Sequence, residues 1–320
     1  MDYFSLIPSD INNIIISYLS SSEDLKALIN TFNLINLNWS SIHEYHFGKY
    51  KQMNKLDYIT KFGAETLIKE LNLELTVDEL LNLKELDLSR KNLMRVPSEI
   101  FDLTNLQDLS LISNFLTEIP KEIEKLINLR ILYLSINRFE QVPLEIYNLK
   151  NLQKLYLSNN RIKLIPEGSL KDLINLQVLH LDNNYIIKVP LEIVNLSNLE
   201  VLNLQHNRLT ELPSGTFNLP KLKVLNLGHN KITEIHPQIF NMTNLIELNI
   251  ENNLLTRIPK EIGILTNLRE LILINNKITD MPQEISNLKK LRILLLRNNE
   301  LKMYQIPAEI RGNRYIDLNI

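Results

Sequence analysis

Two histidines stand at the same point of a recurring sequence pattern, and together they could bind a metal ion. His206 and His229 are 23 residues apart, and the imidazole ring is the commonest side-chain ligand for zinc and similar ions. If neighbouring copies of the pattern stack side by side, the two rings would lie about 4.8 Å apart, one strand spacing. The same column of the pattern holds no carboxylate, and solvated surface histidines would give the same sequence. We therefore predict no metal site.

Other catalytic chemistry has no residues to support it. The chain of 320 residues contains no cysteine, which excludes thiol nucleophiles and cysteine-based zinc sites. It has only 7 glycines, and it lacks the glycine-rich phosphate-binding loops, the G-x-S-x-G nucleophile motif and the H-E-x-x-H zinc motif. The sequence therefore predicts a protein that is not an enzyme and that needs no cofactor.

The pattern that carries the histidines recurs along most of the chain, and residues Leu152 to Pro166 give a clear copy of it. This copy reads L-x-x-L-x-L-x-x-N-x-I-x-x-I-P. Leu152, Leu155 and Leu157 alternate like a short strand with one buried face. Successive copies begin 23 residues apart at every step except one, where the interval is 24. Ten copies begin at Leu83, Leu106, Leu129, Leu152, Leu176, Leu199, Leu222, Leu245, Leu268 and Leu291.

These copies resemble the leucine-rich repeat, and their recurrence in phase makes the resemblance highly specific. It implies an α/β solenoid, or horseshoe, with ten repeats over residues 83–307 and a parallel sheet on the concave face. After the strand and its turn, a P-x-E-I segment such as Pro97 to Ile100 predicts a helical or 3₁₀ turn on the convex face, because proline is tolerated in a first turn. The 23-residue, proline-containing repeat resembles that of intracellular Ras-pathway scaffold proteins.

One asparagine follows the strand in almost every repeat. Its side chain carries hydrogen-bond donors and an acceptor, and the turn after a strand leaves buried backbone groups that need partners. We therefore expect each asparagine to satisfy its own turn and that of a neighbour. The first repeat has Lys91 instead, at an edge where the site can be solvated. The predicted asparagine ladder consists of Asn114, Asn137, Asn160, Asn184, Asn207, Asn230, Asn253, Asn276 and Asn299.

The strand residues between the repeated leucines point outward, and most of them are polar. An apolar cluster interrupts this surface where Tyr133 and Tyr156 occupy equivalent positions in adjacent repeats. Clustered exposed apolar residues commonly mark contacts with a partner, and aromatic residues are favoured there. Tyrosines merely tolerated on a sheet surface are the alternative explanation. We predict that a protein target binds a tyrosine patch made of Ile112, Ile131, Tyr133, Ile136, Tyr156 and His180.

Residues 1–50 do not follow the repeat and are predicted to form helices. The segment L-I-P-S-D-I over residues 6–11 starts the first helix, and a second follows Asp24. With Trp39 these residues resemble an F-box, although the interval from Leu25 to Trp39 is longer than in that family. The resemblance implies docking onto a Skp-family adaptor of a cullin-RING ubiquitin ligase. An ordinary helical cap on the first repeat is the alternative. The predicted adaptor-binding residues are Pro8, Ile11, Ile15, Leu19 and Leu25.

Short segments join and close the repeats. Residues 51–82 are predicted to be a helical linker and an N-terminal cap. Within them Ile68, Leu71 and Leu73 have the spacing of a cap strand, and the apolar residues of 77–81 have that of a short helix. Residues 308–320 are predicted to be a C-terminal cap that includes a strand, because Ile316, Leu318 and Ile320 alternate.

The formal net charge of −2 predicts neither nucleic-acid binding nor attachment to an anionic membrane. The N-terminus lacks the basic residues of a signal peptide, and no apolar stretch is long enough to span a bilayer. Extracellular leucine-rich repeat proteins resemble one another in having cysteine-rich caps, which are absent here. We predict a cytoplasmic protein. The frequent Asn, Ile and Lys residues resemble those of repeat proteins from giant amoeba-infecting DNA viruses, which would mean the host cytoplasm.

Taken together, these patterns predict a protein–protein interaction module. The first interpretation is an F-box-type substrate receptor that links a bound target to a cullin-RING ubiquitin ligase. The alternative is a non-enzymatic intracellular scaffold of the Ras-pathway leucine-rich repeat type, in which the N-terminal helices serve only as a cap.

Overall fold

The computed structural model describes residues 55–168, 170, 172–213, 219–313 and 317–319. The contacts within the chain separate it into two compact units. The first consists of Met1–Lys84 and Val96–Leu106, and the second of Glu85–Arg95 and Gln107–Ile320. In the part of the chain that the structure describes, no helix is both long and apolar enough to cross a membrane.

The first unit contains helix α4 (Lys55–Glu70), helix α5 (Val77–Leu81) and the 3₁₀ helix η3 (Ser98–Asp102), and α4 contacts both of the others. Thr76 begins α5 with a capping box, in which the Thr76 hydroxyl accepts from the backbone N–H of Glu79 and the Glu79 carboxylate accepts from the backbone N–H of Thr76. The short helix predicted over residues 77–81 is therefore confirmed.

The cap strand predicted from Ile68, Leu71 and Leu73 is wrong, because α4 continues to Glu70 and no strand follows before α5. Ala64, Leu67 and Leu71 are buried at positions i, i+3 and i+7. This helical spacing places all three on one face and competes with the alternation of Leu71 and Leu73. The helical period buries these three residues, whereas Leu73, which the strand pattern would also bury, is only half-buried.

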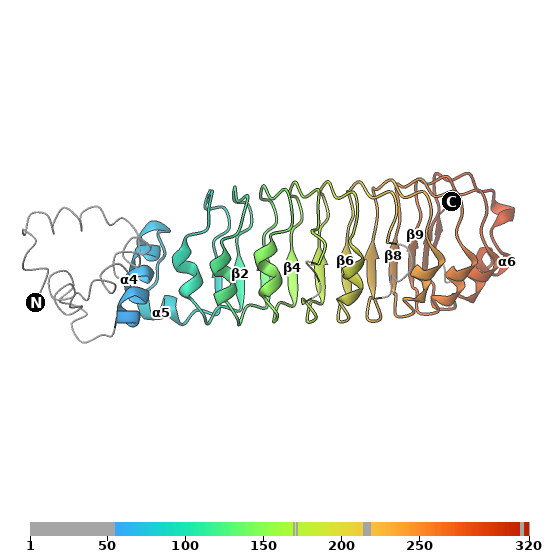
Figure 1. Ribbon diagram of the computed structural model, residues 1–320. Coiled ribbons are helices and arrows are strands. Elements are labelled where there is room, and N and C mark those ends of the chain that lie inside the picture. The colour runs from blue at the N-terminus through green and yellow to red at the C-terminus, as the bar shows by residue number, and fades with distance from the viewer. Residues whose placement is uncertain (1–54, 169, 171, 214–218, 314–316, 320) are drawn as a thin grey trace, which may run out of the picture. The chain divides into compact units, whose positions relative to one another are not determined.

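The second unit is built on one sheet of eleven parallel strands, which lie side by side in the order of the sequence (Figure 1). The strands are β1 (Glu85–Asp87), β2 (Asp108–Ser110), β3 (Ile131–Tyr133), β4 (Lys154–Tyr156), β5 (Val178–His180), β6 (Val201–Asn203), β7 (Val224–Asn226), β8 (Glu247–Asn249), β9 (Glu270–Ile272), β10 (Ile293–Leu295) and β11 (Asp317–Asn319). The α/β solenoid predicted from the repeats is confirmed.

Each strand is three residues long, and its middle residue is a leucine in register with the leucines of its neighbours. Leu132 pairs with Leu109 on one side and Leu155 on the other, and all three are fully buried. The residues before and after this leucine point away from the core, and we call the surface that they form the strand face. The predicted strand in the C-terminal tail is present as β11, which pairs with β10, although Ile316 and Ile320 lie outside the described residues.

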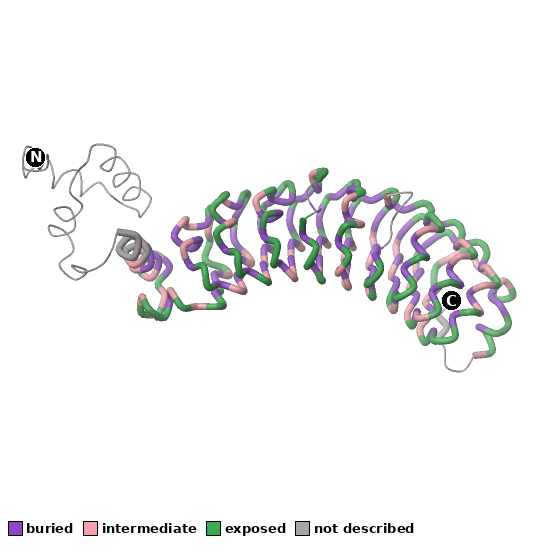
Figure 2. The backbone as a smooth tube through the Cα atoms, turned by 60° about the horizontal axis from the view of Figure 1, so that its bottom comes forward, coloured by how far each residue is buried: buried purple, intermediate pink, exposed green. Residues whose placement is uncertain are grey.

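Short 3₁₀ helices return the chain from one strand to the next. In most of them a proline immediately precedes the helix, and the third residue of the helix is a buried isoleucine. Pro120 and Ile123 are an example. Buried positions recur at the same points of successive coils, and the coils of the second unit follow a curved path (Figure 2). The elements are η4 (Lys121–Lys125), η5 (Leu144–Asn148), η6 (Leu191–Asn195), η7 (Pro237–Asn241), η8 (Lys260–Ile264), η9 (Gln283–Asn287), η10 (Met303–Gln305) and the final helix α6 (Ala308–Arg311).

In most repeats the asparagine after the strand is held inside the coil by four hydrogen bonds, and Asn184 is an example. The Asn184 amide donates to the carbonyls of Leu181 and Asp182 in its own turn and to that of Leu157 in the preceding repeat, at 2.9–3.2 Å. Its carbonyl oxygen accepts from the backbone N–H of Ile162 at 2.9 Å. The asparagines from Asn114 to Asn276 are all buried, and Asn299 is half-buried. Each therefore bonds both its own turn and the preceding repeat.

Candidate functional site

The tyrosine patch lies on the strand face, where three ring side chains follow one another on neighbouring strands. Tyr133 pairs with Tyr156, and Tyr156 pairs with His180. The two tyrosine rings are stacked, with centroids 4.7 Å apart and planes 9° from parallel. The centroid of the His180 ring lies 5.1 Å from that of Tyr156. These residues are half-buried, so one edge of the stack stays available to a partner.

A carboxylate anchors the histidine end of this stack. Asp182 accepts hydrogen bonds from the Ser158 hydroxyl at 2.7 Å and the Asn203 amide at 3.0 Å, and its Oδ1 lies 3.6 Å from Nδ1 of His180. Burial raises the pKa of Asp182, but hydrogen bonds from His180, Ser158 and Asn183 outweigh it and lower the pKa below its ordinary value. Asp182 is therefore ionised at neutral pH and fixes a negative charge beside the ring.

The remaining predicted residues of the patch are isoleucines. Ile131 lies on the same strand as Tyr133 and is half-buried, and Ile112 follows the neighbouring strand and is also half-buried. The side chain of Ile136 is 50% exposed, in the turn that follows Tyr133. The structure therefore brings the predicted residues onto adjacent strands and turns, although Ile112 and Ile136 follow their strands and do not belong to the strand face.

The backbone has a positive φ at the same position of every repeat, and in one repeat that position is Ile136. Its φ is +58°, and Asn159 in the next repeat has a φ of +56°. Left-handed backbone crowds the Cβ atom of an L-residue and is a genuine outlier for a β-branched one, at a cost of about 1–2 kcal/mol. Most equivalent positions hold asparagine, serine or histidine. An isoleucine that is both strained and half-exposed does not help folding, so we connect it with binding.

Replacing Ile136 by asparagine is expected to raise the free energy of unfolding by about 1 kcal/mol, because asparagine tolerates this conformation. Urea unfolding measures the change. The reciprocal variant Asn159→Ile, at the equivalent position of the next repeat, should lose a similar amount. An unchanged or lower stability of Ile136→Asn would show that the position carries no strain.

Two cation–π pairs were not among the predicted residues, although the partners in each pair are one repeat of 23 residues apart. The Arg138 guanidinium lies 4.4 Å from the centroid of the Phe115 ring, and Arg208 lies 4.5 Å from that of Tyr185. Each pair joins the residues that follow the ladder asparagines of adjacent repeats. Phe115 and Tyr185 are exposed. Aromatic rings and arginines of this kind are enriched at protein interfaces, and only knowledge of the register between repeats reveals them.

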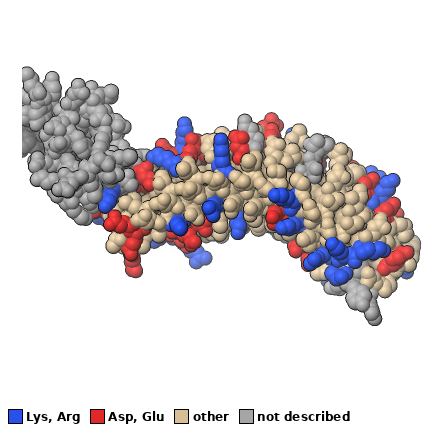
Figure 3. Space-filling model, turned by 90° about the horizontal axis from the view of Figure 1, so that it is seen from below, with Lys and Arg blue, Asp and Glu red and all other residues tan. Residues whose placement is uncertain are grey.

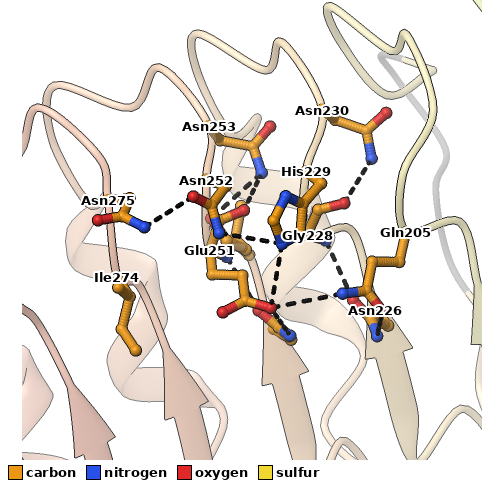
Figure 4. Close-up of polar contacts among 12 residues, drawn as sticks. Gln205, Asn226, Gly228, His229, Asn230, Glu251, Asn252, Asn253, Ile274 and Asn275 are labelled. Atoms are coloured by element: carbon orange, nitrogen blue, oxygen red, sulfur yellow. Dashed lines mark hydrogen bonds and ion pairs between the residues drawn. The ribbon is translucent and has the colours of Figure 1, made fainter.

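The two histidines considered as metal ligands are stacked on each other, with ring centroids 3.8 Å apart. Nε2 of His229 lies 3.1 Å from the Asn252 amide nitrogen and 3.8 Å from Oε1 of Glu251 (Figure 4). Burial, and then the charge of His206, lower the pKa of His229, while Glu251 acts in the opposite direction. A carboxylate therefore does lie beside the pair, but it comes from the next repeat and another column. Among the described residues, no three potential ligands are grouped as a metal site.

A chain of amide side chains connects this histidine pair to its neighbours. The Asn226 amide donates to Gln205 at 3.0 Å, and the Gln205 amide donates across two repeats to Glu251 at 3.4 Å (Figure 4). Gly228 lies between them. A Cβ atom at Gly228 would be 3.1 Å from Cγ of Glu251 and 3.4 Å from Cγ of Gln205. The glycine therefore leaves the space through which the glutamine reaches the carboxylate.

The predicted adaptor-binding residues Pro8, Ile11, Ile15, Leu19 and Leu25 lie outside the described residues. Their role therefore stays a prediction from the sequence pattern.

Comparison with known families supports the repeat. The family described as leucine rich repeat matches residues 82–139 and 127–186, and the leucine-rich repeat region matches residues 167–275. No curated protein matches the chain. A leucine-rich repeat protein of Leptospira interrogans is 33% identical to it, with a TM-score of 0.63, over 77% of this chain and 74% of that one.

Two further solved structures are similar. TLR13, solved in a complex with ssRNA13, is 31% identical with a TM-score of 0.62, over 73% of this chain and 34% of that one. An internalin of Listeria monocytogenes, with 23% identity, a TM-score of 0.51 and coverage of 80% and 87%, shows the fold alone. The periodic leucines, the parallel strands in register, the asparagines in their turns and these relatives lead to one conclusion: the chain belongs to the leucine-rich repeat family.

Proposed function

We propose that this protein is a substrate receptor. Its tyrosine patch binds a protein target, and its first 50 residues recruit a Skp-family adaptor and, through it, a cullin-RING ubiquitin ligase. Leucine-rich repeat proteins act as protein–protein interaction modules, and the fold is typically a binding scaffold without enzymatic activity. We propose the same absence of catalysis for this chain, with action in the cytoplasm.

The observation that carries the target-binding half is the stack of Tyr133, Tyr156 and His180. The buried leucine stripe does not need these rings, because they occupy the outward positions of their strands. Equivalent positions in the following repeats hold Asn203 and Asn226, so polar residues serve the fold there. A rigid aromatic stack with strained Ile136 nearby is what an interface anchor requires.

A protein is the favoured class of target. The patch combines apolar and aromatic side chains with the carboxylate of Asp182, and the chain carries a net charge of −2. Nucleic-acid binding draws most of its affinity from cations that neutralise phosphates, and the six residues of the patch supply no lysine or arginine. We therefore do not propose that this patch binds RNA, although TLR13 was solved in a complex with ssRNA13.

The adaptor half rests on the F-box-like pattern of residues 1–50. The alternative is a scaffold of the Ras-pathway type, and it is favoured by the 23-residue repeat with a proline before the 3₁₀ turn. The two functions differ in one measurable property, which is binding of a Skp-family adaptor.

We expect the full chain to bind a purified Skp-family adaptor at about micromolar concentration or below, measured by isothermal titration calorimetry. Changing Ile11, Ile15 and Leu19 together to aspartate should remove this binding, because charges cannot enter an apolar helix interface without a large desolvation cost. As a control, the same three charges are placed at Ile127, Ile174 and Ile187, which are exposed in the second unit. If the unaltered chain does not bind the adaptor, the scaffold is the better proposal.

A further inference from the structure

A second column of asparagines, which the repeat pattern had not suggested, stands just before the strands. Asn198 donates its amide to the carbonyl of Ile174 at 2.7 Å, and Asn244 and Asn267 make the equivalent bond at 2.6 and 2.9 Å. Asn105, Asn151 and Asn175 do the same in earlier repeats. Each bond joins a side chain to the backbone of the preceding repeat, so asparagine is the residue that serves the fold at this position.

Lysine interrupts this column in two places, at Lys221 and Lys290. Their ammonium groups donate to the side-chain oxygens of Asn198 and Asn267, at 2.6 and 2.7 Å. A lysine here adds a charge and loses more conformational entropy than asparagine when it is ordered. Each lysine keeps one hydrogen bond to the preceding repeat, as asparagine does, so the fold does not require the added charge and the two cations call for another explanation.

The two lysines line one groove together with Lys223 and Arg269. Its volume is about 520 Å³, and its other lining residues are Glu200, Asn244, Ile246 and Asn267. We call it the basic groove. Seen from below the view of Figure 1, Lys and Arg side chains gather over the C-terminal repeats (Figure 3). A chain with a net charge of −2 therefore concentrates positive charge on one surface.

Most of this charge is not neutralised within the groove. Lys223 forms an ion pair with Glu200 at 2.7 Å, and Glu200 is the sole carboxylate in the lining. Among the residues that the structure describes, no ion pair involves Lys221, Arg269 or Lys290. Three of the four cations are thus available to an anionic ligand.

We propose that the basic groove binds an acidic, extended segment of a partner protein. Lys223 and Arg269 lie two repeats apart in one column, about 10 Å, and Lys221 and Lys290 lie three repeats apart in the neighbouring column, about 14 Å. Carboxylates on one face of an extended peptide are about 7 Å apart, within the reach of flexible lysine and arginine side chains. Ile246 offers an apolar contact beside the cations.

The lining favours a peptide over a nucleic acid. Single-stranded nucleic acids are held by aromatic rings that stack on the bases, and the groove is lined by none. Four cations also neutralise few phosphates, so binding of a nucleic acid would weaken steeply at physiological salt. The groove and the tyrosine patch share no residue, and the proposal holds whether or not the patch captures the target.

The test measures fluorescence anisotropy of a labelled peptide of alternating glutamate and serine added to the full chain at low salt. The probe should bind, and the same peptide with glutamine for glutamate should not. Lys221→Asn with Lys290→Asn should weaken binding about tenfold or more. This variant restores the residue used in the other repeats, so its melting temperature should not fall. Lys231→Asn with Lys277→Asn removes the same charge from exposed positions outside the groove and should change the affinity less than about twofold.

Several results would overturn the proposal. One is a full chain that does not bind the glutamate peptide. Another is a Lys221→Asn, Lys290→Asn variant that binds it as tightly as the unaltered chain does, or no more weakly than the control variant does. A third is an RNA oligonucleotide of equal charge that binds more tightly than the peptide and depends on the same two lysines, which would make the groove a nucleic-acid site.

Discussion

Replacing Tyr133 and Tyr156 together by alanine is expected to weaken capture of the protein target about thirtyfold or more. Loss of a central interface aromatic commonly costs about 2 kcal/mol or more, which corresponds to that factor. The two rings stack at 4.7 Å and 9°, so they present one preorganised surface to a partner. Removing both takes away the largest ring area of the tyrosine patch and leaves Ile131 and His180 without their neighbours.

The same change should cost little stability. Both tyrosines point outward from the leucine core, and an offset aromatic pair adds about 0.5–1.5 kcal/mol to a fold. Melting curves of the variant should therefore stay cooperative and shift only slightly. The loss of binding can then be assigned to the surface and not to unfolding.

The measurement is quantitative affinity purification from cells with the immobilised full chain, followed by mass spectrometry of the proteins that it enriches. The matched control is Ile272→Ala with Leu295→Ala, which truncates two apolar residues in the same column of adjacent strands. If this pair lowers recovery of the target more than the tyrosine pair does, the binding site lies further along the sheet and the tyrosine patch is not the target site.

Replacing Asn184 by leucine should cost about 1–3 kcal/mol of unfolding free energy. The change leaves the N–H of Ile162 without its partner inside the coil, whereas the carbonyl of Leu157 loses the Asn184 amide and keeps that of Asn160. Each buried group left unpaired costs about 1–3 kcal/mol. The leucine side chain has a similar volume but cannot form any of these bonds, so the loss falls on the backbone of two repeats.

The comparison is with Lys91→Leu, at the position of the first repeat that corresponds to the ladder. Lys91 is exposed, and its backbone N–H bonds to Asn114 and is unaffected by the side chain. Its replacement should change stability by less than about 0.5 kcal/mol. Urea unfolding of both variants provides the test, and equal losses at the two positions would contradict the ladder as a source of stability.

The repeat pattern alone was enough to predict the strands, their register and the parallel sheet. A solenoid allows this because each repeat contacts mainly its neighbours, so a residue's place in the pattern specifies its surroundings. Leu155 is buried and Tyr156 points outward because they occupy alternate positions of a three-residue strand. The stack of Tyr133 and Tyr156 follows from the same register.

The pattern failed where the chain leaves the repeat. Ile68, Leu71 and Leu73 suggested a strand, but burial of Ala64, Leu67 and Leu71 on one face favoured helix α4. Short apolar runs fit both periods, and the packing of α4 against α5 and η3 decided between them.

Contacts between side chains of different repeats were decided by the tertiary structure. The carboxylate of Glu251 beside His229 and the cations of the basic groove cannot be read from any single repeat. Lys221, Arg269 and Lys290 are far apart in the sequence and line one groove because the coils stack at one strand spacing. The leucines and asparagines are specified by the repeat because every coil must bury them, whereas these side chains are free to vary and acquire their neighbours only when the coils stack.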